Sequence, residues 1–508
     1  MNRIEKMKKE KNGLSILSDL DHYAKGMISE LSDDDLSRMR WYGLFYRKRE
    51  GGFMVRVRVP SGKLTSIQME QLADIADHYG DQTVAITTRM GVQIRRVALG
   101  NIPSLLQALK DAGLDTRQTG LDNVRNFMNC PVAGLQSHEA FDASEILEEI
   151  SKQIIGNPLY ADLPRKFNIS ITGCYEDCAH SRLNDIGLIP QVIPLAQGDK
   201  EGFRIRIGGA IGKLYANIGE DLGVWIPKEL AGDCVMALLD LFREHGNRDN
   251  RNKARMFHLL EQWGLPKLLD ELNQRMGQEL PKVVADVKEH HHHDHIGIHP
   301  QKTTGYFYAG VSVPNGKMSS GQCRKLAQLA NEYGQSEIRL TAGQNVVIPS
   351  IPEIRLKRFK QEALLQELAY DPTPLYRGLV TCTGKEGCDL AIVDTKTPAL
   401  RLIAELESRL IIRREELRIH WSGCPNSCAI IQTGDIGLRG TKARVNGVLV
   451  DAVDIFYGGS IGHHARIGAL LKEKVPVQNL TDELVEILID ERYFTGIYLK
   501  KTQGIGYV

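Results

Sequence analysis

The chain has 508 residues, of which 42% are hydrophobic and 25% charged, and its formal net charge is +1. This composition is typical of a globular protein of roughly two to four domains, or of one pseudo-symmetric assembly. The balanced charge argues against nucleic-acid or membrane partners, and no apolar run is long enough to span a bilayer. The charged N-terminus lacks a secretory pattern, so the nine cysteines predict a reducing cytoplasm and no disulfide framework.

The N-terminal part of the chain alternates predicted helices and strands. Residues 1–44 predict a polar helical arm, with a helix that starts at Ser32 to Asp35. Alternating apolar and basic residues predict a strand in F-M-V-R-V-R-V-P, residues 53–60. An amphipathic helix is predicted from Ile67 to Tyr79, and a second strand over residues 83–94.

The same order of elements returns later in the chain. V-P-x-G-K at 59–63 recurs at 313–317, a spacing of 254 residues. G-C-Y-E-D-C at 173–178 matches G-C-P-N-S-C at 423–428, and G-G-x-I-G at 208–212 returns at 458–462, both at a spacing of 250. Registers kept over such lengths predict an internal duplication, with two half-molecules packed together.

The two copies differ in the residues that could carry chemistry. Arginines of the first copy are replaced in the second, while the second copy alone has a full set of four cysteines. This division predicts a single active site at the interface of the two copies. The arginines Arg56, Arg58 and Arg89 correspond to Gly310, Ser312 and Gly343.

A histidine-rich stretch, V-K-E-H-H-H-H-D-H-I-G-I-H-P at 287–300, joins the two copies. Histidine-rich tracts can bind metal. Because this one lies at a predicted linker, we expect a solvated segment whose affinity for metal is incidental.

Four cysteines near the C-terminus form the most specific motif. Cys382 and Cys388 are separated by five residues, and Cys424 and Cys428 by three, with 35 residues between the pairs. Four thiolates suit zinc or an iron–sulfur cluster, and the five-residue gap argues against zinc, whose paired cysteines are usually closer. Unrelated buried thiols are the alternative, which two tight pairs beside Gly and Pro disfavour.

With this motif the whole chain resembles the nitrite and sulfite reductases that contain sirohaem and a 4Fe–4S cluster. The resemblance implies that the quartet holds the cluster and that Cys428 also ligates the sirohaem iron. It implies an α+β fold of pseudo-two-fold duplicated architecture, with ferredoxin-like half-modules and two α/β sirohaem-binding domains. The expected segments are an arm (1–44), a half-module (45–115), an α/β domain (116–285), the linker (286–300), a half-module (301–360) and an α/β domain (361–508).

The first copy keeps only Cys174 and Cys178 of this motif. A second cluster would need two further ligands, and no cysteine pair lies nearby. We therefore expect these two cysteines to be relics of the duplication.

The resemblance also implies contacts to the carboxylates of sirohaem, which arginine binds well. Arg251 and Arg255, four residues apart, are expected on one helical face. A solvated helix face remains the alternative for these arginines, and an ordinary tight turn for the G-G-x-I-G loops. The implied set is Arg89, Gln93, Arg95, Arg251, Arg255, Arg339, Gln344, Asn345, Gly458 and Gly459.

On the substrate side the resemblance implies Arg56, Arg125, Lys166 and Asn168. Lys166 and Asn168 would point to the same side of a strand. Sulfite reductases of the family typically have Lys-x-Lys here and nitrite reductases Lys-x-Asn, as in this chain. Arg95 also resembles nitrite reductases, since sulfite reductases commonly have histidine at that position.

The sequence is therefore interpreted as an assimilatory ferredoxin-dependent nitrite reductase, which reduces nitrite to ammonium with six electrons. A sulfite reductase with the same cofactors is the main alternative. A non-catalytic iron–sulfur electron carrier or structural metal protein would explain the quartet but not the arginines of the first copy. No dinucleotide fingerprint or flavin module is present, so reduced ferredoxin is the expected donor, although no basic docking patch is evident. We expect a monomer.

Overall fold

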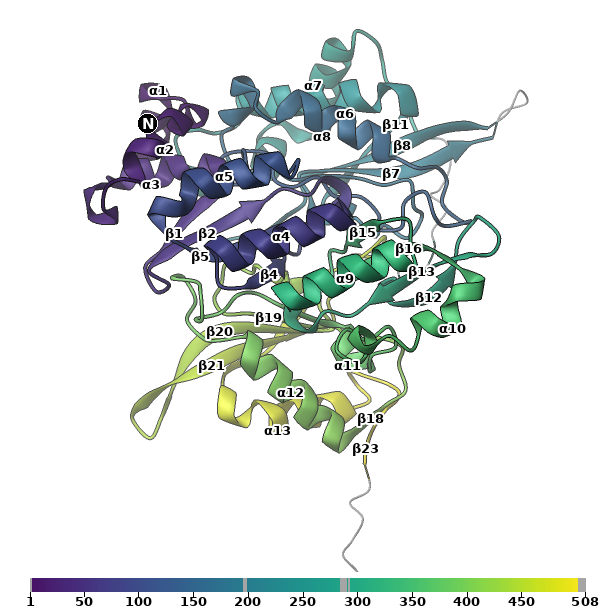
Figure 1. The fold of residues 1–508 in the computed structure, drawn as a ribbon. Coiled ribbons are helices and arrows are strands. Elements are labelled where there is room, and N and C mark those ends of the chain that lie inside the picture. Colours follow the sequence, from purple (N-terminus) through teal and green to yellow (C-terminus); the bar gives the residue numbers. More distant parts are fainter. Residues whose placement is uncertain (1, 195–198, 284–289, 291–292, 501–508) are drawn as a thin grey trace, which may run out of the picture. The chain divides into compact units, whose positions relative to one another are not determined.

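The computed structural model describes residues 2–194, 199–283, 290 and 293–500, and the ribbon is shown in Figure 1. The chain forms two compact units, each described here by itself. The large unit comprises Met1–Asp371 and Gly462–His464, and the small unit comprises Pro372–Ile461 and Ala465–Val508. The two units therefore do not coincide with the two sequence copies. In the described part of the chain no helix is both long and apolar enough to cross a membrane.

The N-terminal arm is helical, as predicted. It contains α1 (Arg3–Glu10), α2 (Leu17–Tyr23) and α3 (Asp33–Arg38). The predicted start of α3 is confirmed, because Ser32 and Asp35 form a reciprocal capping box: the Asp35 N–H donates to Ser32 Oγ at 3.1 Å and the Ser32 N–H to Asp35 Oδ2 at 3.2 Å.

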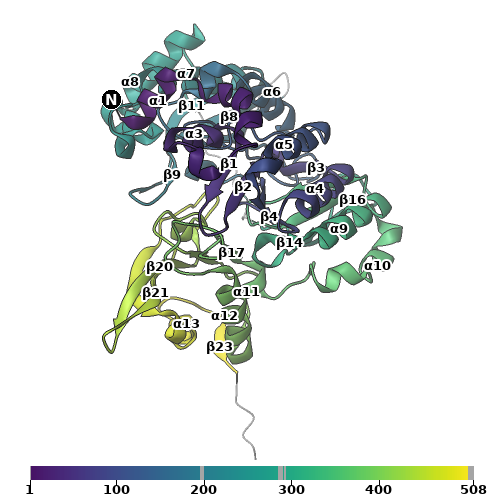
Figure 2. The ribbon, with the colours of Figure 1, turned by 60° about the vertical axis from the view of Figure 1, so that its left-hand side comes forward.

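Two related sheets in the large unit exchange one strand with each other. The first has the order β1-β2-β5-β4-β14 and the second β12-β13-β16-β15-β3, so the last strand of each comes from the other copy. Helices α4 (Ser66–Tyr79) and α9 (Ser320–Glu332) lie side by side over them (Figures 1 and 2). The two copies are thus built around one core. The strands are β1 (Leu44–Arg47), β2 (Gly52–Val57), β3 (Lys63–Thr65), β4 (Thr83–Ile86), β5 (Val92–Val97), β12 (Gly297–Pro300), β13 (Tyr306–Val311), β14 (Lys317–Ser319), β15 (Glu337–Leu340) and β16 (Val346–Pro352).

The prediction of one strand over residues 83–94 is wrong. The segment is a hairpin of β4 and β5, and its turn contains Met90 with φ +57°. The β-branched threonines before the turn resemble strand residues, which hid the turn from the sequence pattern.

The duplication is visible in the backbone as well as in the sequence. Non-glycine residues rarely adopt positive φ, so their recurrence at a fixed spacing marks loops of the same shape. Such residues recur at the two spacings found in the sequence, which confirms the duplication. The pairs are Ser61/Asn315, Gln82/Ser336, Met90/Gln344 and Arg96/Ser350 at 254, and Asp177/Ser427 and His180/Ile430 at 250.

The first α/β layer also belongs to the large unit. Its sheet has the order β11-β8-β7-β6, and residues 124–128 extend it beside β6 through parallel bridges at Val124–Phe167 and Met128–Ser170. Helices α6, α7 and α8 cover this sheet (Figure 2). The elements are α6 (Ser144–Ile154), β6 (Ile169–Ile171), β7 (Ile186–Ile193), β8 (Lys200–Ile207), β11 (Glu220–Pro227), α7 (Ala231–His245) and α8 (Met256–Met276), with α5 (Ile102–Asp111) preceding them.

The small unit repeats this layer. Its sheet has the order β17-β19-β20-β21-β22, with β17, β19 and β20 parallel. The Val380–His420 partners in this sheet correspond to the Met128–Ser170 bridge of the first layer. The elements are β17 (Leu379–Thr381), α12 (Lys396–Arg409), β18 (Leu410–Ile412), β19 (Ile419–Ser422), β20 (Ile436–Val445), β21 (Val448–Tyr457), β22 (Ala469–Pro476), α13 (Leu480–Ile489) and β23 (Ile497–Leu499), which pairs with β18.

Candidate functional site

Two of the predicted substrate arginines meet at one backbone carbonyl in the large unit. Arg56, on β2, donates from Nη1 to the Thr119 carbonyl at 2.9 Å. Arg125 donates to the same carbonyl, and its Nη2 donates to the Leu121 carbonyl at 2.9 Å. The shared acceptor brings two guanidinium groups together.

Arg58 holds the chain segment that carries Arg125. It is 1% exposed and donates to the carbonyls of Arg117, Val124 and Arg125. Burial lowers its pKa to about 10. Arg58 is therefore a positioning residue rather than a ligand group.

The electrostatics of this region favour an anion. Burial lowers the pKa of Arg125 well below its ordinary value, and the nearby charges of Arg56 and Arg89 lower it further, while Asp122 acts in the opposite direction. Several cations held close together repel one another, and a bound anion relieves that repulsion.

Asn168 lies beside Arg125, and Lys166 lies two residues before Asn168. Lys166 and Asn168 flank Phe167, whose side chain is in the core, and both precede β6. That the two side chains point to the same side stays a prediction. The parallel bridge between Val124 and Phe167 places Arg125 next to Asn168.

Asn168 is held by its backbone and has an unused side-chain atom. It is 2% exposed, and its N–H donates to Asp185 Oδ2 at 2.8 Å. Within the described residues, neither Asn168 Oδ1 nor Arg125 Nε has a hydrogen-bond partner although both are buried. Buried polar atoms without partners are costly, so this pair of atoms indicates a place for a polar ligand or water.

Arg251 and Arg255 are engaged by carboxylates. Arg251 binds Asp122 through two bonds of 2.6 and 2.7 Å, and Arg255, 1% exposed, binds Asp185 at 3.1 and 2.7 Å. Although burial opposes its charge, Asp185 keeps the pKa of Arg255 above its ordinary value. The prediction that both lie on one helical face is wrong, since Arg251 begins a 3₁₀ turn and Arg255 precedes α8.

Arg89, Gln93 and Arg95 lie on the first half-module, on or before β5. The register of β2 and β5 puts Gln93 opposite Arg56. Arg95 Nη1 donates to Gln93 Oε1 at 3.3 Å, and its Nε pairs with Glu50 at 2.7 Å. Arg89 is half-buried, and its carbonyl accepts from Asn126 at 2.7 Å. The proposed contacts of these residues with a cofactor remain predictions.

Three residues predicted from the second half-module are buried and bonded to backbone. Arg339 donates to the carbonyls of Pro131 and Ala133, Gln344 donates to the Ile86 carbonyl, and Asn345 accepts from the Val313 N–H. These bonds hold loops in place, so a cofactor contact for these residues rests on the resemblance alone.

Gly458 and Gly459 pack against their own chain in the small unit. A Cβ on Gly459 would lie 2.5 Å from the Gln432 carbonyl oxygen and 2.6 Å from that of Gly434, and Gly458 has φ +75°. The internal turn therefore requires both glycines, whether or not a macrocycle approaches them.

The cysteine quartet lies in the small unit at the ends of two paired parallel strands. Cys382 follows β17, and Cys424 comes shortly after β19. The sulfur of Cys382 accepts the N–H groups of Gly423 at 3.1 Å and Gly384 at 3.4 Å. Burial, with the nearby Cys428 thiol, raises the pKa of Cys382 to about 12.

The quartet fits an iron–sulfur cluster. N–H groups directed at a sulfur are typical of cluster ligands, and Gly384 is required because a Cβ there would lie 2.6 Å from the Thr395 nitrogen. Cys424 is buried while Cys428 is exposed, which suits a ligand shared with a second metal centre.

The expectation that no further ligands lie near Cys174 and Cys178 is wrong. Cys130 and His295 converge on them, and all four side chains are at most 4% exposed. Local spacing could not reveal this cluster. The one available signal was that Cys130 precedes Cys382 by 252 residues, close to the repeat spacing.

The prediction that the histidine-rich linker is solvated is wrong at its C-terminal end. His295 is 2% exposed, and His290 stacks against His138 and Tyr175. His291, His292 and residues 284–289 lie outside the described residues. The end of the linker is therefore part of the packed large unit.

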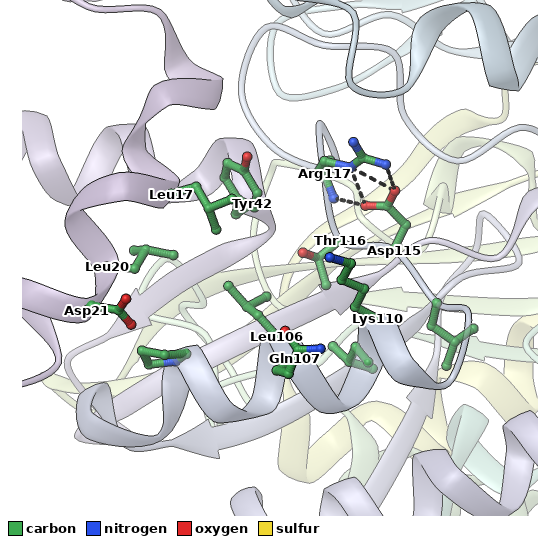
Figure 3. A pocket seen from close by; sticks show the side chains of 13 residues that line it. Leu17, Leu20, Asp21, Tyr42, Leu106, Gln107, Lys110, Asp115, Thr116 and Arg117 are labelled. Carbon is green, nitrogen blue, oxygen red and sulfur yellow. Dashed lines mark hydrogen bonds and ion pairs between the residues drawn. The ribbon is translucent and has the colours of Figure 1, made fainter.

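A pocket of about 430 Å³ lies between the N-terminal arm and α5 (Figure 3). Asp115 and Arg117 on its lining form an ion pair at 2.6 Å, so they satisfy each other. No residue predicted for substrate, cofactor or cluster lines this pocket. It is separate from the predicted centre.

Comparisons with known proteins agree with the geometry. Residues 120–280 match the nitrite and sulphite reductase 4Fe-4S domain, and residues 46–112 and 299–365 match the nitrite/sulfite reductase ferredoxin-like half domain. A ferredoxin–nitrite reductase of Synechococcus elongatus is 37% identical over 498 residues, 96% of each chain. An assimilatory ferredoxin-dependent nitrite reductase of Haloferax mediterranei is 31% identical over 95% of this chain and 88% of the relative. The NirA protein of Mycobacterium tuberculosis has a TM-score of 0.88 and 30% identity, covering 96% of this chain and 92% of that one.

Proposed function

Because the chain belongs to the nitrite and sulfite reductase family, we propose that it is a ferredoxin-dependent nitrite reductase. It reduces nitrite to ammonium with six electrons. The predicted fold class is that of the family, and the sirohaem and 4Fe–4S cluster are those of the family.

The observation that supports nitrite most directly is the neutral residue in the cationic site. Arg56 and Arg125 meet at the Thr119 carbonyl, and Asn168 lies next to Arg125. Sulfite carries more negative charge than nitrite near neutral pH, so an additional lysine would suit it better. An amide matches the smaller charge of nitrite.

The residues of the chain position the substrate and its protons. Arg56, Arg125 and Lys166 attract nitrite and orient its oxygens by electrostatic preorganisation. Asn168 Oδ1 is placed to accept a hydrogen bond from a water, which in turn supplies protons to the substrate. The sirohaem and cluster, when bound, supply the electron transfer.

A short network positions Asn168. Arg255 neutralises Asp185, and Asp185 Oδ2, which accepts from Arg255 Nη2, also accepts the Asn168 N–H. Because Asp185 is fully buried, its charge requires Arg255. Arg255 and Asp185 are therefore positioning residues in this proposal.

Reduced ferredoxin is the proposed donor, as the names of the relatives imply. None of the nine cysteines, all of which are among the described residues, is joined in a disulfide, and the proposed compartment is a reducing one such as the cytoplasm. A monomeric state, with no nucleic-acid partner, completes the proposal.

Steady-state turnover with a chemical reductant tests the substrate without the natural donor. We expect kcat/KM for nitrite to exceed that for sulfite by at least about tenfold. A preference for sulfite would make the chain a sulfite reductase. An absorption spectrum without a chlorin-type macrocycle would instead support an electron carrier.

A further inference from the structure

The large unit contains a cluster of buried metal-ligand side chains that belongs to neither the quartet nor the substrate site. The Glu176 carboxylate borders this cluster, with Oε2 3.6 Å from Cys178 Sγ and 3.9 Å from His295 Nε2. Cys130, Cys174, Cys178 and His295 are 1%, 1%, 4% and 2% exposed. His295 Nε2 lies 3.0 Å from Cys178 Sγ and 3.8 Å from Cys130 Sγ, and the sulfurs of Cys174 and Cys178 are 3.9 Å apart. We propose that these residues bind a single zinc ion in a closed Cys₃His site.

The spacing of the sulfurs favours one ion over a cluster. Tetrahedral zinc with Zn–S bonds of about 2.3 Å holds its sulfurs about 3.8 Å apart. The three sulfurs here all lie within 4.8 Å of one another. Among the described residues, the quartet forms no group as tight as this, as expected for ligands kept apart by the volume of a cluster.

The site occupies the position of the quartet in the other copy. Cys174 and Cys178 correspond to Cys424 and Cys428 at a spacing of 250. The matching strand pairs, Met128–Ser170 and Val380–His420, place Cys130 where Cys382 stands. The fourth ligand differs: Gln136 stands 252 residues before Cys388, and His295 from the linker supplies the missing donor.

The surroundings orient these ligands. Gln136 lies 3.4 Å from Cys174 Sγ and 3.4 Å from His295 Nδ1. With its amide turned end for end, Gln136 donates an N–H to the thiolate and accepts the His295 Nδ1 proton, which leaves Nε2 for the metal. Arg339, from β15, fixes the loop after Cys130 through the carbonyls of Pro131 and Ala133.

The site explains one difference between the copies. Gly310, on β13, stands where the first copy has Arg56. A Cβ on Gly310 would lie 1.8 Å from the His295 carbonyl oxygen, so only glycine lets this histidine reach the cysteines. A zinc ion here would fasten the end of the linker to the first α/β layer.

Elemental analysis of the purified holoprotein tests the proposal. We expect about one zinc per chain in addition to the iron of the cofactors. Cys130→Ser and Cys178→Ser should each lower zinc at least roughly tenfold without changing iron. Cys234→Ser and Cys323→Ser, at buried thiols outside the site, are the matched controls and should change neither metal.

X-ray absorption at the zinc edge of the wild-type protein tests the site even if a variant fails to fold. We expect three sulfur neighbours and one nitrogen. Wild-type protein without zinc would overturn the proposal. So would a loss of iron in Cys130→Ser or Cys178→Ser, because it would indicate a second cluster. Nitrite turnover by the wild-type protein is measured independently of its zinc content, so this proposal and the proposed function fail separately.

Discussion

The two copies of the chain have cysteines at three equivalent positions and differ in the residue at the fourth ligand position. In the small unit Cys388 completes a quartet whose Cys428 is exposed. In the large unit the equivalent position is Gln136, and the buried His295 closes a tighter group. An open set of ligands can serve catalysis, whereas a closed one serves structure.

Asn168, which is proposed to contact the substrate, also differs from its counterpart in the second copy. Its counterpart at a spacing of 250 is Arg418, and each donates its N–H to an equivalent aspartate, at 2.8 Å to Asp185 and 2.9 Å to Asp435. Arg418 also pairs with Asp435 through its own side chain, at 3.1 Å. In the first copy Arg255 takes over that pairing, so the side chain of residue 168 can serve the site.

The largest effect is expected at Cys428. Cys428→Ser removes the proposed ligand shared by cluster and sirohaem iron, so nitrite turnover should fall by at least about a thousandfold. Steady-state assays and iron analysis measure this. The equivalent change Cys178→Ser is the control and should keep its iron. Normal turnover by Cys428→Ser would contradict the assignment.

The next effect concerns the buried pair of Arg255 and Asp185. Arg255→Met leaves a fully buried carboxylate without its cation, which should cost about 3–5 kcal/mol in the free energy of unfolding. Urea unfolding measures the loss. Arg251→Met is the matched control, and its loss should be smaller because Lys8 and Arg165 also lie near Asp122. Equal losses in the two variants would contradict the special role of Arg255.

Features that depend on short residue spacings or on a long repeat in the sequence could be predicted. The quartet was found because its cysteines lie in two tight pairs, and the duplication because matching residues keep one spacing. The proposed anion site rests on a resemblance that carries over residue by residue.

The features that the sequence did not predict mostly depend on contacts between distant parts of the chain. Cys130 and His295 join Cys178 only in the folded structure, 165 residues apart from each other. The exchange of β3 and β14 between sheets leaves no local pattern. Arg251 and Arg255 have helical spacing, but Asn250 caps a 3₁₀ turn that ends before α8 begins.

A smaller effect is expected at Asn168. Asn168→Lys adds a cation beside Lys166, and charge-assisted hydrogen bonds are about twice as strong as neutral ones, so the more highly charged anion gains most. The ratio of kcat/KM for nitrite to that for sulfite should fall about tenfold. Asn168→Gln, which keeps a neutral amide, should change the ratio little. An unchanged ratio in Asn168→Lys would remove Asn168 from the anion site.

The smallest effect is expected at its counterpart, Arg418. Burial alone would raise the pKa of Asp435, but Arg418 and Arg414 hold it below its ordinary value. Asp435 therefore stabilises the fold above the pKa it has when unfolded, about 3.9, and this contribution is lost as the pH falls through the lower folded value. Arg418→Gln weakens that depression, so the variant should lose stability most at neutral pH and approach the wild type in acid. Each unit of pKa restored corresponds to about 1.4 kcal/mol.

Thermal unfolding between neutral and acid pH, followed by hydrogen exchange in β19, measures this loss in the small unit. Asp435→Asn is the control, because it removes the titrating group. In that background the loss of stability caused by Arg418→Gln should no longer depend on pH. If Arg418→Gln changed the ratio of nitrite to sulfite turnover as strongly as Asn168→Lys does, the two positions would share a role. The inference that residue 168 serves the substrate site while its counterpart Arg418 only stabilises the fold would then be wrong.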